Sequence, residues 1–168
     1  MKKTGIIYGS STGTCEDLAG RIAEKLGISS DDVYSVDKLT AELVDEYEAL
    51  LLGTSTWGEG ELQDDWYDGL SVLQGANLAG KTIALFGCGD SDSYPDTFCD
   101  GIAGLYDGLK DSGATFIGGG VSADDYNYSS SASVVDGAFI GLALDEVNES
   151  DKTDDRIDAW VTALQAEL

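Results

Sequence analysis

The stretch IIYGSSTGTC at residues 6–15 joins a short apolar run to a loop of hydroxyl-bearing residues, glycines and a thiol. Residues 6–8 are typical of the end of a buried strand. Residues 15–26, CEDLAGRIAEKL, place leucine and isoleucine at the four-residue spacing of one helix face. The stretch therefore predicts a strand, a loop and a helix in direct succession.

The predicted loop has the chemistry of a phosphate site. Backbone N–H groups at a helix N-terminus have no intrahelical partner, and Gly13 lets the chain approach an anion closely. The hydroxyl groups of Ser10, Thr12 and Thr14 add further donors. The structural alternative is an ordinary helix cap by Thr14 or Ser11. The loop is neither a Walker loop, because no lysine follows its second glycine, nor a GxGxxG motif.

Apolar strands and amphipathic helices alternate along the rest of the chain. Further strands are expected at residues 33–36, 49–53, 82–87 and 114–117. Further helices are expected at about residues 40–46, 62–73, 96–112 and 154–168. Near-continuous apolar strands between amphipathic helices predict an α/β fold, with a doubly wound parallel sheet covered by helices on both faces.

Residues 118–152 interrupt this alternation with a segment rich in Gly, Ser, Tyr and Asp. The segment is too long for a plain connector, and residues 138–144 (AFIGLAL) are too apolar for disorder. We therefore expect an ordered insertion at about 118–152, in or after the last strand. The length of 168 residues suits one domain that spans residues 1–168.

The composition narrows the classes of partner and site. Nine Lys and Arg residues against 32 Asp and Glu residues give a formal charge of −23, which favours basic proteins over nucleic acid and anionic membranes. The chain has no histidine, and its three cysteines form no CxxC motif, so we expect no metal site. The absence of a signal peptide and of a long apolar run predicts a cytoplasmic location.

Two further loops are expected at the ligand-binding edge of the sheet. In doubly wound folds, ligands bind at the carboxyl ends of strands where the strand order reverses. The loops at residues 54–61 and 88–94 each carry one large aromatic residue, Trp57 and Tyr94. Either ring could simply pack on the protein surface. Beside a phosphate loop, however, the two rings predict a site for a phosphate-bearing ligand with a flat ring.

Together these motifs resemble the flavodoxin family in its long-chain form. The resemblance covers essentially the whole chain and runs through IIYGSSTGT, TSTWGEGELQDDWYDGL, FGCGDSDSYPDTFCD and GLALDEVNESDKTDDRIDAW. It implies a five-stranded parallel sheet of order 2-1-3-4-5 with FMN at the switch point; flavodoxins are themselves the known example of this arrangement. One position departs from the family pattern, because Cys15 stands where the phosphate loop commonly ends in threonine.

The resemblance also implies three groups of cofactor-binding residues. The residues expected to hold the phosphate are Ser10, Ser11, Thr12, Gly13, Thr14 and Cys15. Those expected on one side of the flavin ring are Ser55, Thr56, Trp57 and Gly58. Those expected on the other side are Cys88, Gly89, Asp90, Tyr94 and Cys99, with Tyr94 stacked on the ring and Asp90 near its pyrimidine edge. Cys88 and Cys99 have the alternative role of small packing residues. For Gly58, the resemblance implies a peptide bond that turns over when the flavin is reduced.

The implied function is that of a low-potential one-electron carrier without substrate turnover of its own. Several acidic residues and no lysine lie in the three loops, so added negative charge on a bound flavin is disfavoured. The expected partners are basic-surfaced reductases and low-potential acceptors, and the expected state is a monomer. An FMN-dependent quinone or nitro reductase is the alternative. A bacterial receiver domain shares the strand order, but it needs acidic residues directly after the first strand, where this chain has GSSTGT.

Overall fold

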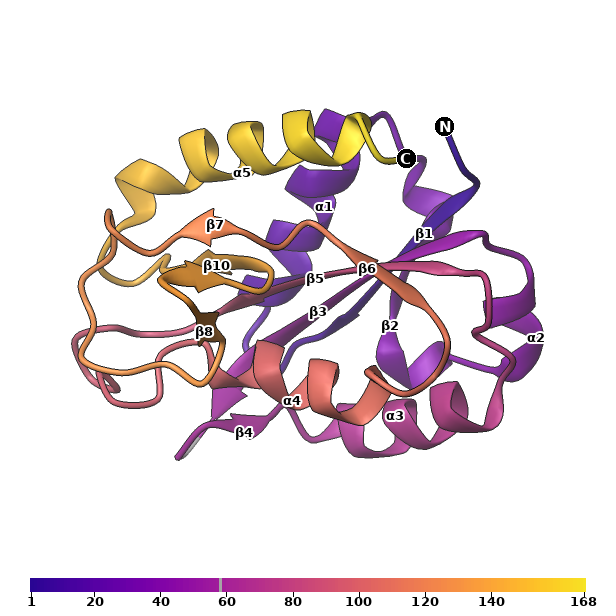
Figure 1. Ribbon diagram of the computed structural model, residues 1–168, viewed down its shortest axis with the longest axis horizontal. Coiled ribbons are helices and arrows are strands. Elements are labelled where there is room, and N and C mark those ends of the chain that lie inside the picture. The colour runs from indigo at the N-terminus through magenta and orange to yellow at the C-terminus, as the bar shows by residue number, and fades with distance from the viewer. Residues whose placement is uncertain (58) are drawn as a thin grey trace.

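The computed structural model describes residues 1–57 and 59–168, and a parallel sheet forms its centre (Figure 1). Four parallel strands occupy the order β2-β1-β3-β5. Their bounds are β1 (Thr4–Gly9), β2 (Val33–Ser35), β3 (Ala49–Trp57) and β5 (Thr82–Cys88). In register, Ile6 lies beside Val33 on one side and Leu51 on the other. The doubly wound order expected from the sequence is confirmed.

Two separate strands share the fifth position of the sheet. β6 (Thr115–Ile117) pairs parallel with the first half of β5, and β10 (Leu142–Leu144) pairs parallel with the second half. A short strand, β4 (Glu61–Leu62), runs antiparallel to the end of β3. Within residues 1–57 and 59–168 the sheet therefore has seven strands rather than the expected five, because β4 adds one and because the chain leaves the sheet after Ile117 and returns at Leu142.

The chain between β6 and β10 forms a small antiparallel sheet of order β7-β9-β8. Its strands are β7 (Val121–Ser122), β8 (Val134–Val135) and β9 (Ala138–Phe139). Aromatic packing attaches this segment to the main body, since the ring of Phe98 lies 5.7 Å from that of Tyr128 and 6.0 Å from that of Phe139 between centroids. Rings at such distances contribute beyond the area they bury.

Helices cover both faces of the sheet (Figure 1). α1 (Thr14–Leu26) and α5 (Ser150–Gln165) lie on one face, and α3 (Asp65–Gly75) and α4 (Asp100–Leu109) lie on the other. The remaining helical segments are η1 (Ser30–Asp32), η2 (Val36–Lys38) and α2 (Ala41–Asp45). Successive strand residues point to opposite faces. Accordingly, Ile6 packs in the core beneath α1 and α5, whereas Ile7 packs in the core with α3 and α4.

Two boundaries near the ligand-binding edge differ from the sequence expectation. β3 continues past Gly53 to Trp57, because its last residues pair with β4. α4 begins at Asp100 rather than near Asp96, because the backbone at Cys99 is left-handed, with a φ of 53°. Among the described residues, none of the helices combines the length and apolar character needed to cross a bilayer.

Candidate functional site

The carboxyl ends of β1, β3 and β5 lie side by side, since Gly9 pairs with Thr54 and Thr54 pairs with Gly87. A cavity of about 200 Å³ opens at this edge. Its walls come from the three predicted loops and from the loop after β10. The lining residues are Thr12, Thr14, Ser55, Thr56, Trp57, Cys88, Gly89, Asp90, Tyr94, Glu146 and Val147.

The loop after β1 leaves the N-terminus of α1 without a side-chain cap. The N-cap residue is Gly13, whose φ of 91° lies in the left-handed region that favours glycine. The Ser10 hydroxyl accepts a hydrogen bond from the Gly13 N–H at 3.1 Å and thereby shapes the loop. Thr14 and Ser11 are therefore not the helix cap. Thr12 and Thr14 both line the cavity, so residues at the open end of the helix form part of its wall.

Gln63 and Trp66 lie against the start of this loop. A role in the site was predicted for neither residue. The Gln63 amide donates to the Ser11 hydroxyl at 3.1 Å, and the Trp66 indole donates to the Gly53 carbonyl at 2.8 Å. A Cβ atom on Gly9 would lie 2.5 Å from Cδ1 of Trp66 and 2.7 Å from Oε1 of Gln63. Glycine at position 9 thus allows the two buried side chains to reach the base of the loop.

Trp57 and Tyr94 form an aromatic wall at the mouth of the cavity. The Trp57 indole donates to the Ser55 hydroxyl at 2.8 Å, which fixes the ring over the end of β3. Trp57 is 41% exposed and Tyr94 is 51% exposed. Small-molecule sites usually enclose about 300–1,000 Å³. A planar ligand would therefore project from this smaller cavity and keep one edge near solvent.

Asp90 is held by its own loop and by the loop after β10. Its Oδ1 accepts hydrogen bonds from the Ser93 N–H at 3.0 Å and from the Asn148 amide at 2.8 Å. Burial raises the pKa of Asp90, but these hydrogen bonds outweigh burial, so the net shift of the pKa is downward. Asn148 also contacts the buried carboxylate of Asp145, at 3.1 Å to its Oδ2. The Asn148 amide therefore links the carboxylates of Asp90 and Asp145 on the polar side of the cavity. Asn148 was not among the predicted site residues.

Several predicted residues lie beside the cavity rather than in its wall. Ser10, Ser11 and Gly13 belong to the adjoining loop, and Cys15 and Cys99 are completely buried. The neighbouring Cys88 thiol and burial raise the pKa of Cys15 well above its ordinary value, and burial does the same for Cys99. The Cys99 thiol donates to the Leu144 carbonyl at 3.7 Å. These contacts fit packing roles for Cys15 and Cys99.

Gly58 lies outside the described residues, and so does its predicted peptide turn. Within residues 1–57 and 59–168, no group of three or more His, Cys, Asp and Glu side chains could hold a metal ion.

Glu146 and Val147 line the cavity although they were not predicted. They follow β10, the second half of the fifth strand, and therefore lie at the same carboxyl-terminal edge as the three predicted loops.

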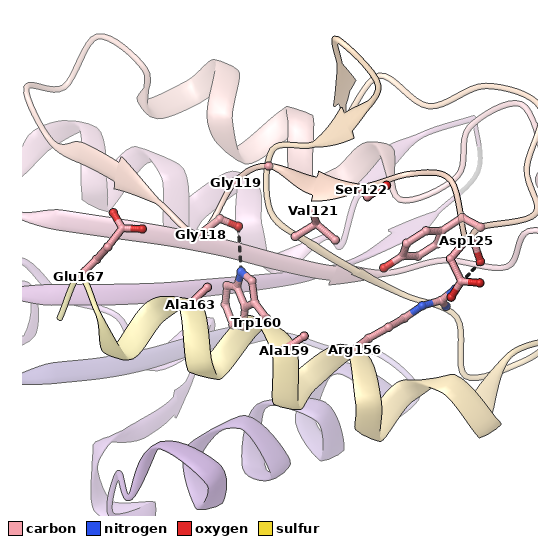
Figure 2. A pocket seen from close by; sticks show the side chains of 12 residues that line it. Gly118, Gly119, Val121, Ser122, Asp125, Arg156, Ala159, Trp160, Ala163 and Glu167 are labelled. Atoms are coloured by element: carbon pink, nitrogen blue, oxygen red, sulfur yellow. Dashed lines mark hydrogen bonds and ion pairs between the residues drawn. The ribbon is translucent and has the colours of Figure 1, made fainter.

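A second cavity, of about 340 Å³, lies between α5 and residues 118–122 (Figure 2). Among the residues that the structure describes, it shares no lining residue with the cavity at the strand ends. Its cation, Arg156, is partly engaged: Nη2 donates to the Asp125 carbonyl at 2.9 Å and the guanidinium lies 3.7 Å from the Tyr126 ring centroid, whereas Nε and Nη1 have no hydrogen-bond partner among the described residues. The strand-end cavity is better suited to phosphate, because it adjoins an open helix N-terminus.

The fold and the strand-end cavity define a class of doubly wound protein whose switch point carries a cavity suited to a phosphate-bearing planar ligand. Comparison with known sequences agrees with this class. The sequence model of the family described as Flavodoxin matches residues 6–160. Flavodoxin 1 from Azotobacter vinelandii is 43% identical, over 100% of this chain and 98% of that protein. Flavodoxin 1 from Escherichia coli is 38% identical, over 100% of this chain and 96% of that protein.

Comparison with solved structures gives the same result. The crystal structure of Fusobacterium nucleatum flavodoxin bound to flavin mononucleotide superimposes with a TM-score of 0.90 and 34% identity. The match covers 100% of this chain and 99% of that protein. This chain belongs to the flavodoxin family, whose members are electron-transfer flavoproteins.

Proposed function

We propose that this chain binds FMN non-covalently and carries single electrons between redox proteins at low potential, without turning over a substrate of its own. The observation that supports this most is one cavity in which Thr12 and Thr14, at the open end of α1, share walls with Trp57 and Tyr94. FMN supplies the redox chemistry when bound, and the protein supplies binding and electrostatics. Reconstitution of the apoprotein should show one FMN bound per chain.

Each part of the ligand has a matching part of the site. The loop expected to hold the phosphate comprises Ser10, Ser11, Thr12, Gly13, Thr14 and Cys15, through hydroxyl groups and backbone N–H groups. Trp57 and Tyr94 would cover the ring from the mouth of the cavity, with Ser55 and Thr56 beneath. Gly89 and Asp90 would meet its polar edge, and Cys88 would contribute main-chain atoms. Gly58 and Cys99 remain assigned to the site by resemblance alone.

The charges around the site favour a low potential. Glu59, Glu61, Asp64 and Asp65 are exposed between the end of β3 and the first turn of α3, with Glu61 in β4, and Asp90 lies in the cavity wall. The three loops contain no lysine or arginine. Negative charge gained by the cofactor on reduction would therefore be opposed by like charge. This arrangement lowers the potential at which the last electron is accepted.

An FMN-dependent quinone or nitro reductase is the second candidate, and the site does not favour it. Such an enzyme usually binds a nicotinamide nucleotide, and the loops around the cavity lack basic residues that would hold its phosphates. The measurement that separates the two is steady-state NADPH oxidation by the purified protein. A carrier should show little oxidation until a reductase is added, whereas a reductase should turn over alone.

Stacking of the aromatic wall on the flavin leads to a spectroscopic prediction. Flavin fluorescence should be strongly quenched in the complex and partly restored in Trp57→Ala, because the indole contacts the ring directly. The same variant should bind FMN roughly two- to tenfold more weakly, since such stacking contributes about 0.5–1.5 kcal/mol beyond area burial. Tyr67→Ala is the matched control: Tyr67 is 53% exposed but does not line the cavity. Bright emission from the wild-type complex would exclude stacking.

The exposed carboxylates beside the cavity lead to a prediction about partners. We define the acidic rim as Glu59, Glu61, Asp64, Asp65 and Asp68. Electron transfer with a basic redox partner should slow as the Debye length falls from about 10 Å at 0.1 M salt to about 3 Å at 1 M. Asp64→Asn with Asp65→Asn should also slow it. The same charge change at Glu42 and Glu46, exposed at α2, should have little effect. A rate independent of salt would indicate an apolar docking face.

We further propose that residues 1–168 act as one domain and as a cytoplasmic monomer. Continuity of the main sheet through both halves of the fifth strand supports a single domain. A formal charge of −23 opposes self-association. The three cysteines are free thiols, which suits a reducing compartment.

A further inference from the structure

One wall of the flavin cavity contains a carboxylate with a single compensating partner. Glu146 lies in the loop after β10, and its side chain is 24% exposed. Its Oε2 accepts a hydrogen bond from Nη1 of Arg21 at 3.3 Å. Its Oε1 is buried and has no hydrogen-bond partner in the described part of the chain. Among residues 1–57 and 59–168, Arg21 is therefore the one residue that offsets the charge of Glu146 directly.

Arg21 is held from three sides. Its Nη2 lies 2.7 Å from Oδ1 of Asp154 on α5, and its Nη1 lies 3.6 Å from Oδ2 of Asp17, one turn earlier on α1. The guanidinium thus joins α1, the loop after β10 and α5. A side chain with several fixed partners keeps its position better than one in an isolated surface pair. Glu146 is consequently presented to the cavity in a defined place.

This pair differs from the other ion pairs of the described residues. Lys25 pairs with Asp158, one turn beyond Arg21 on the same face of α1, and neither residue lines the cavity. The pairs made by Lys110, Lys152 and Arg156 also involve no lining residue. Among ion pairs in residues 1–57 and 59–168, only Arg21 with Glu146 therefore places a compensated charge in the cavity wall.

We propose that Arg21 is a positioning residue of the flavin site, which holds Glu146 in the cavity wall and offsets its charge beside the cofactor. The inference rests on the proposed binding of FMN. Without Arg21, an uncompensated carboxylate would face a cofactor that carries phosphate and gains negative charge on reduction. Without the charge of Glu146, one negative charge facing the cofactor would be lost, and Arg21 would stay paired with Asp17 and Asp154. The two side chains should therefore act on FMN in opposite directions.

The test is a double-mutant cycle on FMN affinity and on the second reduction potential. At low salt, Arg21→Gln should raise the Kd for FMN roughly three- to tenfold, because one nearby positive charge is lost. It should also shift the second potential to more negative values. Glu146→Gln should leave the Kd unchanged or lower it, and should shift the potential the other way. The double variant should return towards wild type in both quantities.

Two matched variants distinguish an effect of charge on FMN binding from an effect on the fold. Lys25→Gln removes the same charge from the same helix and should change the Kd less than about twofold. Arg21→Lys keeps the charge and should stay within about twofold of wild type. Urea unfolding of each apoprotein verifies that the variants fold.

Failure of the proposal for Arg21 and Glu146 can be distinguished from failure of the proposed FMN binding. Equal weakening by Arg21→Gln and Glu146→Gln, with no opposite shift in potential, would overturn the proposal by showing that the pair merely holds the fold. No difference between Arg21→Gln and Lys25→Gln would overturn it too. Failure of the wild-type protein to bind FMN would instead overturn the proposed function.

Discussion

Riboflavin should bind at least about 100-fold more weakly than FMN. The two ligands share the ring and the hydroxylated chain, so they differ only in the phosphate that the open end of α1 would hold. A hydrogen bond to a charged group contributes about 1.5–3 kcal/mol. Two such bonds contribute roughly 3–6 kcal/mol, which corresponds to about 10²–10⁴ in affinity. Titration of the apoprotein with each ligand measures the ratio.

Two sets of variants locate the source of this discrimination. Thr12→Val and Thr14→Val should weaken FMN more than riboflavin, because both hydroxyl groups line the cavity at the helix end. Trp57→Ala should weaken both ligands by the same factor, because the ring is common to them. Equal affinities of the wild-type protein for FMN and riboflavin would contradict the assignment of the phosphate loop.

Gly9→Ala should lower the free energy of unfolding by roughly 2–4 kcal/mol and weaken FMN binding as well. The added Cβ would lie 2.5 Å from the fully buried Trp66 and 2.7 Å from Gln63. Overpacking typically costs about 1–3 kcal/mol, and a displaced hydrogen bond adds about 0.5–1.5 kcal/mol. The bonds at risk are those from Trp66 to Gly53 and from Gln63 to Ser11. Urea denaturation of the apoprotein measures the loss.

Gly20→Ala is the matched control. Gly20 lies in α1, and a Cβ atom there would meet no heavy atom within 4 Å. Because alanine is about 1 kcal/mol better than glycine in a helix interior, this variant should be neutral or more stable than wild type. A Gly9→Ala protein as stable as Gly20→Ala would show that Trp66 and Gln63 do not constrain the start of the loop.

The central strands were predictable because both faces of each are buried. Strands such as β1 and β5 therefore read as continuous apolar runs between turn signals. An insertion in or after the last strand was expected from the sequence, but the residues at which the fifth strand resumes could not be located in this way. β10 has three residues, and its place is set by pairing of Leu142 with Phe86, which lies far away in sequence. Local patterns carry no information about such a partner.

The start of α4 shows how packing overrides local pattern. Residues 96–112 have helical apolar spacing, but the Phe98 ring packs against the rings of Tyr128 and Phe139. The next residue, Cys99, takes a left-handed conformation, and the helix begins only after it. Nothing in the pattern of residues 96–112 indicates contacts between Phe98 and rings that lie 30 and 41 residues further along the chain.

The candidate site was predicted where its residues follow a recognisable strand. Thr12 and Asp90 come from loops after clear strands, Trp57 is the last residue of a third strand, and all three line the cavity. Glu146 was missed because β10 was not identified as a separate strand end. The supporting contact from Gln63 to Ser11 was missed because it joins side chains 52 residues apart.

Anaerobic reductive titration of the FMN-loaded protein, followed by its absorption spectrum, tests the account most directly. An electron carrier of the proposed kind should take up two electrons in two separate one-electron steps, with the second at clearly lower potential because of the acidic surroundings. A single two-electron transition would contradict the account, since it would indicate a protein suited to hydride or paired-electron chemistry.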